Sequence, residues 1–136
     1  MRLTLVFLLI TSALFGNPQT VVQEAIKLYE NRADGANGFK AKPEYINSSI
    51  NKLKKAFENA ETEEVAGLYL MRCYIFKGRF AVHNDDEKEE TFLKGKKLGE
   101  KLLKKYPNNK EIIYEYICLI GLWADKAGVM QAAWDG

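Results

Sequence analysis

The sequence predicts an all-α fold in which short helices stack as antiparallel hairpins. Three observations lead to this prediction. Apolar residues recur at intervals of three and four along most of the chain, which is typical of amphipathic helices. No stretch alternates apolar and polar residues for long enough to make a strand. With 47% hydrophobic and 28% charged residues and only 3 Pro and 10 Gly in 136 residues, the chain has the composition of a folded domain.

Residues 1–16 are expected to be a cleaved secretory signal peptide. A positively charged start precedes a mainly apolar run over residues 3–15. At about 1.5 Å per residue this run reaches roughly 20 Å, which is shorter than the ~30 Å core of a bilayer. Asn17 and Pro18 break the run after the small Gly16, where we expect cleavage. A buried N-terminal helix of a cytosolic protein is the alternative.

The mature chain, residues 17–136, is therefore expected in the periplasm or outside the cell, as one domain without a membrane segment. Its charge is nearly balanced, because Lys+Arg 20 against Asp+Glu 18 gives +2 for the whole chain. A nucleic-acid partner is not expected, since dedicated nucleic-acid binders are strongly basic. With one His and two Cys in the sequence, we expect no metal site, no cofactor and no enzymatic activity.

Two helices are expected in the first part of the mature chain. Asn17 suits the N-cap of the first helix and Pro18 its first turn, and the helix stops before Asp34-Gly35. Pro43 opens the second helix. Its apolar stripe steps by four, three, four and three residues through Ile46, Ile50, Leu53, Phe57 and Ala60.

Two longer helices follow. Thr62 is expected to cap the third, whose body over residues 65–76 is apolar on nearly all sides and should therefore lie in the middle of the domain. The fourth runs from about Asp85 to Tyr106. It has acidic residues at its start and lysines at its end, and both stabilise the helix macrodipole.

A fifth helix begins after Pro107, where Asn108 with Glu111 resembles a capping box, and ends at Gly128. The residues from Val129 to Trp134 look like the start of a sixth helix of hardly any length. The chain therefore holds about two and a half hairpins, which fits either a half-hairpin at the end or a chain truncated at its C-terminus.

The third and fifth helices resemble each other at an offset of 47 residues, which superposes Tyr69 on Tyr116 and Phe76 on Trp123. The charged helices beside them carry small residues on their inner faces. Small residues let helix axes approach closely, as they do in helical solenoids. These small residues are Ser49 and Ala56 in the second helix and Gly95 and Gly99 in the fourth.

Gly95, Gly99, Leu102 and the run at residues 106–109, Tyr-Pro-Asn-Asn, resemble the end of a tetratricopeptide repeat, whose second helix carries spaced small residues and closes on Pro-Asn. The segment 114–128 is also similar to repeat-type helical proteins of bacterial envelopes, among them the T-component family associated with TRAP transporters. The offset of 47 exceeds the usual repeat of about 34 residues. The resemblance implies a scaffold whose first helices line a concave face.

On that face we expect a set of residues to contact a partner. Tyrosines provide a large contact area at low entropic cost, which makes them the first choice for such contacts. The surface would be aromatic and mildly acidic. The alternative is that the tyrosines belong to the core or rim of a helical bundle. The expected contact residues are Glu64, Met71, Tyr74, Glu111 and Tyr114.

The expected function is that of an exported, non-enzymatic scaffold that binds a protein or peptide through this face. The alternative is a small-molecule binder linked to transport, in which aromatic residues enclose a cavity. An enzyme would require His83, or Glu64 together with Glu111, to meet in a cleft. The identity of the partner and the oligomeric state are left open.

Cys73 and Cys118 form an even pair in a chain expected to be exported, which permits a disulfide. The repeat offset argues against one, because it places the two thiols two residues apart along the helix, about 200° around its axis. We therefore expect two separate thiols.

Overall fold

The computed structural model describes residues 16–128 and 133–134. These residues contain α-helices and one π-helical turn but no β-strand, which confirms the all-α prediction. The elements are α2 (Pro18–Glu30), α3 (Pro43–Phe57), α4 (Glu63–Phe76), η1 (Lys77–Ala81), α5 (Asp85–Lys105) and α6 (Lys110–Ala127).

Two predictions concern residues at the ends of the chain. The expected signal peptide covers residues 1–16, and residues 1–15 lie outside the described part. The expected sixth helix covers residues 129–134, of which only the last two are described. Both stay predictions. Among the helices that the structure describes, none combines the length and the apolar content needed to cross a bilayer.

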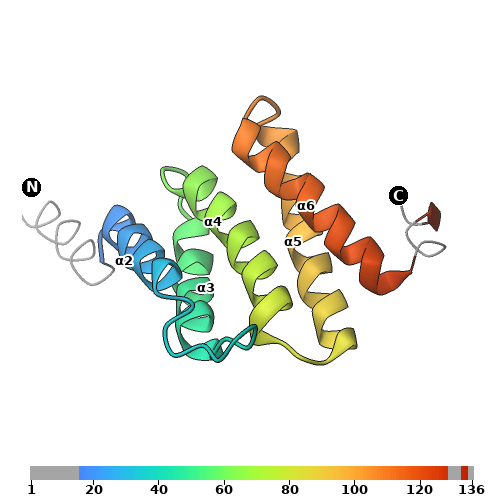
Figure 1. Ribbon diagram of the computed structural model, residues 1–136. Helices are drawn as coiled ribbons and strands as arrows, with labels where there is room; N and C mark the ends of the chain where they lie inside the picture. The colour runs from blue at the N-terminus through green and yellow to red at the C-terminus, as the bar shows by residue number, and fades with distance from the viewer. Residues whose placement is uncertain (1–15, 129–132, 135–136) are drawn as a thin grey trace, which may run out of the picture.

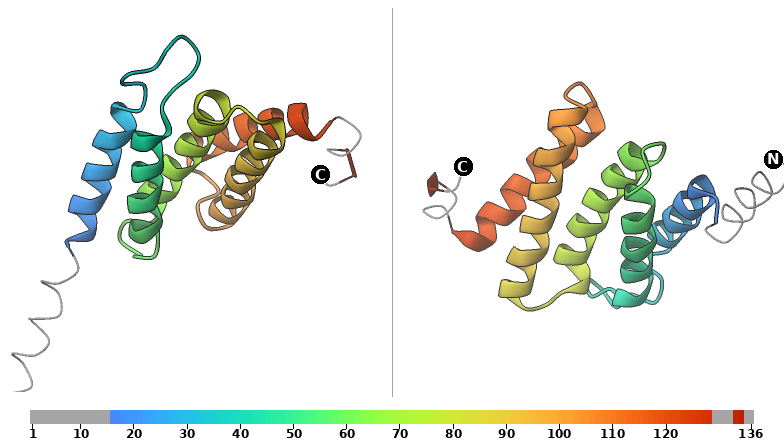
Figure 2. Two further views of the ribbon diagram at one scale, coloured as in Figure 1. Left: turned by 90° about the horizontal axis from the view of Figure 1, so that it is seen from below. Right: turned by 180° about the vertical axis from the view of Figure 1, so that it is seen from behind.

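The helices lie in two layers. In Figure 1, α2, α4 and α6 are at the front and α3 and α5 are behind them, and Figure 2 shows the same arrangement from below and from behind. Each helix packs on the next one in the sequence, and α4 also packs against α2 and α6. Over the described ranges α3 and α5 do not contact each other. The apolar α4 thus occupies the middle of the fold, as its sequence predicts.

Asparagine side chains cap three helices at their N-termini. Asn17 accepts a hydrogen bond from the backbone N–H of Gln19, which confirms the predicted start of α2. Asn84 caps α5 in the same way. The predicted cap of α6 is wrong by one residue, because Asn109 and not Asn108 accepts from the first-turn N–H groups.

Thr62 is the N-cap residue of α4, as predicted, but its side chain does not make the capping hydrogen bond. Its hydroxyl instead donates to the backbone oxygen of Ala56, at 2.6 Å. The side chain is buried between the end of α3 and the start of α4, and it therefore fastens the α3–α4 turn.

Two apolar clusters share α4. The first joins α2, α3 and α4 and contains Val22, Ala25, Ile46, Ile50, Leu53, Ala56, Ala66, Leu70 and Cys73. The second joins α4, α5 and α6 and contains Leu68, Met71, Phe92, Leu102, Ile112, Leu119 and Trp123. Because α4 contributes to both clusters, its sequence is apolar on almost every side.

Small residues bring neighbouring helices together as predicted. A Cβ atom added at Gly95 would lie 2.6 Å from Leu119, and one added at Gly99 would lie 2.6 Å from Tyr116. Both are far inside normal contact distance, so α5 can approach α6 only because these positions are glycine. On the other side of the fold, Ser49 is fully buried and donates a hydrogen bond to the backbone oxygen of Ala25.

Candidate functional site

The residues predicted to bind a partner do not form one surface. Met71 is fully buried, at 0% exposure, in the cluster of α4, α5 and α6, so its assignment to a binding face is wrong. The physical reason is the position of α4. A helix that packs on four neighbours is apolar all round, and its sequence pattern therefore does not distinguish a groove residue from a core residue.

Tyr74 and Tyr114 lie on different parts of the fold. Tyr74 is half-buried in the space between α3 and α5, behind the layer formed by α2, α4 and α6. Tyr114 lies on α6 and is 65% exposed. Tyr74 is two residues from Arg72, which faces α6, and two residues correspond to about 200° around a helix. The structure therefore separates the two tyrosines that were expected to act together.

Glu64 and Glu111 are each held by a different group. The carboxylate of Glu64 accepts a hydrogen bond from the side-chain amide of Asn109 at 2.8 Å, and that of Glu111 accepts one from Arg72. His83 is exposed just before α5. In the described part of the chain, no group of three or more His, Cys, Asp or Glu side chains is arranged to hold a metal ion.

Cys73 and Cys118 are both free thiols, as the repeat offset predicts. Cys73 is buried against Ser49, at 3.5 Å between Sγ and Oγ. Burial raises the pKa of the Cys73 thiol to about 12, although the hydrogen bond with Ser49 acts in the opposite direction. Cys73 is thus a core residue with an unreactive thiol.

Arg72 makes contacts that the sequence does not reveal. Its Nε donates to Glu115 at 2.8 Å and a second guanidinium nitrogen donates to Glu111, so that it joins α4 to α6. Its guanidinium carbon lies 5.1 Å from the ring centroid of Tyr69. Burial disfavours the charge, but the hydrogen bonds with Glu115 and Glu111 outweigh it and raise the pKa of Arg72.

Arg32 makes a similar junction between α2 and α4. Its guanidinium carbon lies 4.0 Å from the ring centroid of Tyr29 and 5.1 Å from that of Phe76. The rings of Tyr29 and Tyr69 meet edge to face, with centroids 5.7 Å apart. Arg32 also donates to the backbone oxygen of Tyr29, whereas its buried Nε has no hydrogen-bond partner among the described residues.

These side chains surround a cavity of about 180 Å³ between α2, α4, η1 and α6. The sequence contains four arginines, and the three that follow the expected leader all line this cavity. We refer to this surface as the arginine face. It consists of Tyr29, Arg32, Tyr69, Arg72, Arg79, Phe80, Glu111 and Glu115.

The aromatic residues of the arginine face are Tyr29, Tyr69 and Phe80 and not the predicted Tyr74 and Tyr114, and the face is not acidic around the cavity. Arg72 pairs with both Glu111 and Glu115, and Arg32 and Arg79, which have no carboxylate partner within the described residues, bring the arginines to three against two carboxylates. The sequence does offer one signal for this site. Arginine is rare in the chain, and Arg72 interrupts the otherwise apolar segment of residues 65–76.

Comparison of the chain with protein-family models, with curated proteins and with solved structures gave no match. The similarity to tetratricopeptide repeats and to the T-component family therefore stays a prediction from the motifs at residues 95–128.

Proposed function

We propose that this chain is an exported interaction scaffold that binds the carboxylate groups of a polypeptide partner on the arginine face. The observation that carries the proposal is the gathering of Arg32, Arg72 and Arg79 around one cavity with aromatic walls. Arginine presents a planar fork of donors that matches a carboxylate, and it also stacks on aromatic rings. Lysine, which is far more abundant in this chain, has neither property to the same degree.

The packing of the two layers supports a concave shape for this face. Helices α2 and α6 both contact α4, whereas α3 and α5 do not contact each other in the described ranges. When helical pairs stack, the layer with the closer helices lies on the inner side of the curve. Consecutive helices also run in opposite directions in Figure 1. Both features fit stacked antiparallel hairpins of the tetratricopeptide type, with α2, α4 and α6 as the inner helices.

The chemistry of the partner follows from the arginines that have no carboxylate partner in the described residues. Arg72 already binds two carboxylates of its own chain, those of Glu111 and Glu115. Neither Arg32, which donates one hydrogen bond to the backbone oxygen of Tyr29, nor the exposed Arg79 has a carboxylate partner in the described part. The neighbouring rings of Tyr29 and Phe80 provide apolar area for side chains that flank the acidic residue. We therefore infer that the preferred ligand is an extended segment with acidic and apolar residues.

A selection from a random peptide library on the purified chain tests this proposal. We expect the selected peptides to be rich in Asp and Glu. The exposed Arg79 is then replaced in Arg79→Gln, and the exposed Lys97 of α5 in Lys97→Gln serves as a control with the same loss of charge. Fluorescence anisotropy should show that Arg79→Gln weakens binding about tenfold or more, as for the loss of a charge-assisted contact, while the control binds as the wild type does. Selected peptides without acidic residues, or equal weakening by both variants, would contradict the proposal.

Export is tested separately by N-terminal sequencing of the chain after expression from its own start codon. We expect it in the cell envelope or the medium, beginning near Asn17. Recovery of the chain from the cytosol with residues 1–16 still attached would contradict export without affecting the binding proposal.

A further inference from the structure

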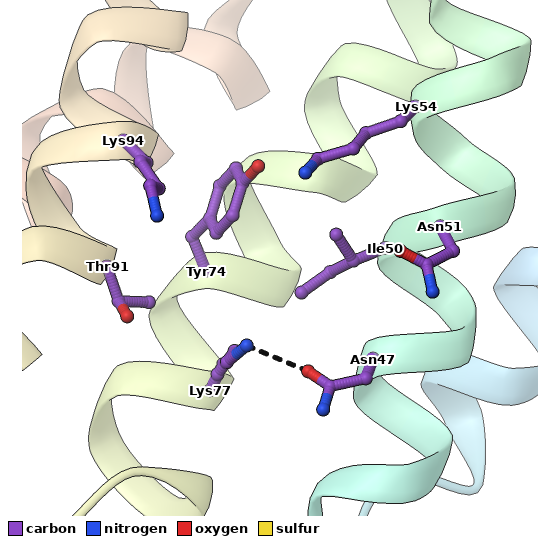
Figure 3. A pocket seen from close by; sticks show the side chains of 8 residues that line it. All are labelled: Asn47, Ile50, Asn51, Lys54, Tyr74, Lys77, Thr91 and Lys94. Atoms are coloured by element: carbon purple, nitrogen blue, oxygen red, sulfur yellow. Dashed lines mark hydrogen bonds between the residues drawn. The ribbon is translucent and has the colours of Figure 1, made fainter. Parts of the chain in front are cut away.

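A second cavity lies between α3, α4, η1 and α5, in the gap that exists because α3 and α5 do not touch. Its volume is about 300 Å³. Figure 3 shows Tyr74 in its middle, with side chains of α3 on one side and side chains of α5 on the other. This cavity shares no lining residue with the cavity of the arginine face, so the two are separate.

Three lysines reach this cavity from three different elements. Lys54 comes from α3, Lys77 from η1 and Lys94 from α5, and none of the residues that line the cavity is acidic. We call this cavity the lysine pocket. The carboxylate of Glu90 pairs with Lys94 from outside the lining, so three lysines face one neighbouring carboxylate and the pocket keeps a net positive charge that attracts anions.

The contacts of the three lysines leave them available to a ligand. Lys94 pairs with Glu90 on the same helix at 2.7 Å, but the two side chains are 57% and 65% exposed, and such a surface pair is weak. Lys77 donates to the side-chain oxygen of Asn47, a neutral group, at 2.8 Å. Lys54 is exposed and has no ion-pair partner in the described residues.

Neutral groups complete the pocket. The side chains of Asn47 and Asn51 line the wall formed by α3, and Ile50 between them supplies an apolar surface. The hydroxyl of Tyr74 lies on the side of the pocket near Lys54. Burial raises the pKa of Tyr74, so its hydroxyl stays protonated and can donate to an anion.

We propose that the lysine pocket binds a small organic molecule with two or three anionic groups, either phosphates or carboxylates. The three ammonium groups set the charge of the ligand, and the volume of about 300 Å³ is at the lower end of the range for small-molecule sites. The tyrosine ring and Ile50 contact the carbon skeleton that joins the anionic groups. This site does not depend on a polypeptide partner at the arginine face.

Isothermal titration calorimetry of the purified chain tests the proposal, with inorganic pyrophosphate and citrate as the two probes. The titrations are made at neutral pH in about 0.15 M NaCl, where the Debye length is about 8 Å and diffuse attraction is largely screened. We expect saturable binding with one molecule per chain. Stronger binding of pyrophosphate would identify the natural ligand as a phosphate compound, and stronger binding of citrate would identify it as a carboxylate.

The decisive variant is Lys54→Gln combined with Lys94→Gln. Both lysines are exposed, so the fold should persist, which circular dichroism checks. The matched control is Lys55→Gln combined with Lys97→Gln, which removes the same charge from the same two helices but outside the pocket. We expect the pocket variant to lose at least about tenfold in affinity and the control to lose less than about twofold.

Two results would overturn the proposal. One is the absence of saturable binding for both probes with the wild-type chain. The other is an equal loss in the pocket variant and in the control, which would mean that the anions respond only to the overall charge of the surface. The Arg79→Gln variant should bind both probes as the wild type does, so a failure at the arginine face and a failure here can be told apart.

Discussion

Arg72 on α4 donates a hydrogen bond from Nε to a carboxylate oxygen of Glu115 on α6, at 2.8 Å. The side chain of Glu115 is only 12% exposed, so this ion pair is largely removed from water. Glu111 accepts from the same guanidinium one helical turn earlier. These contacts therefore hold α6 against α4 and at the same time place one positive group at the wall of the cavity.

Loss of the guanidinium should destabilise the protein. In Arg72→Met the side chain keeps its apolar length, but Glu115 is left partly buried without a partner, so we expect the free energy of unfolding to fall by about 2–3 kcal/mol. Urea denaturation followed by circular dichroism measures this change. Arg79→Gln is the control. Because Arg79 is exposed, its replacement should lower the free energy of unfolding by less than about 0.5 kcal/mol. Equal stability of the two variants would contradict a structural role of the Arg72 pair.

The glycines of α5 should tolerate no side chain. Gly95→Ala and Gly99→Ala each place a methyl group 2.6 Å from a neighbouring side chain of α6, and we expect each to lower the free energy of unfolding by about 1–3 kcal/mol. Gly121→Ala is the matched control on α6, since a Cβ atom there meets nothing within 4 Å. This variant should be about 0.5–1 kcal/mol more stable than the wild type, because glycine weakens a helix. A destabilised Gly121→Ala would show that the helix contacts are not as described.

The hydroxyl of Thr62 should stabilise the fold through its hydrogen bond to Ala56 and not by capping α4. Thr62→Val keeps the shape of the side chain but loses the hydrogen bond to the backbone oxygen of Ala56, and we expect a loss of about 1 kcal/mol in the free energy of unfolding. Thr62→Ser retains the hydroxyl and should keep part of this stability. Thermal unfolding of the wild type, Thr62→Ser and Thr62→Val under the same conditions ranks their stabilities. A Thr62→Val variant as stable as the wild type would show that the hydrogen bond to Ala56 does not stabilise the fold.

Stability should fall at alkaline pH through Cys73. The unfolded thiol loses its proton near the ordinary pKa of 9.0, whereas the folded thiol keeps it up to about 12 because burial disfavours the thiolate. The free energy of unfolding is therefore expected to decrease as the pH rises from 9.0 to about 12. Cys73→Ala should show a smaller decrease over the same range, measured by urea denaturation at each pH. If the free energy of unfolding of Cys73→Ala fell with pH as steeply as that of the wild type, the burial of the thiol would be contradicted.

Local signals in the sequence were sufficient to predict most helix boundaries. Asn17 with Pro18 fixes the start of α2, and Pro43 fixes the start of α3, because these residues act on the nearest turn of backbone. The predicted N-cap of α6 is one residue too early, because Asn108 and Asn109 are both of a residue type that caps helices well. The π-helical turn η1 at the end of α4 has no such local signal and was not predicted.

The surface of the fold was harder to predict than its helices. Met71 and Tyr74 lie three residues apart on a helix that packs on four neighbours. Hydrophobicity alone does not show which side of such a helix lies in the core and which reaches the surface. The contact of Arg72 with Glu111 and Glu115 joins residues about forty positions apart, and only the packing of α6 on α4 brings them together. The lysine pocket likewise depends on the gap between α3 and α5, which arises only when the helices pack and cannot be recognised from any one segment of the sequence.

We propose that a partner binds on the surface that α2, α4 and α6 form together. Nuclear magnetic resonance shift mapping of the ¹⁵N-labelled chain, titrated with an acidic peptide from the library selection, tests it most directly. We predict that the changes concentrate at the arginine face, around Arg32, Arg72 and Arg79, and leave the backbone of α3 unchanged. Changes concentrated on α3 and α5, or none at peptide concentrations that saturate binding, would contradict the claim.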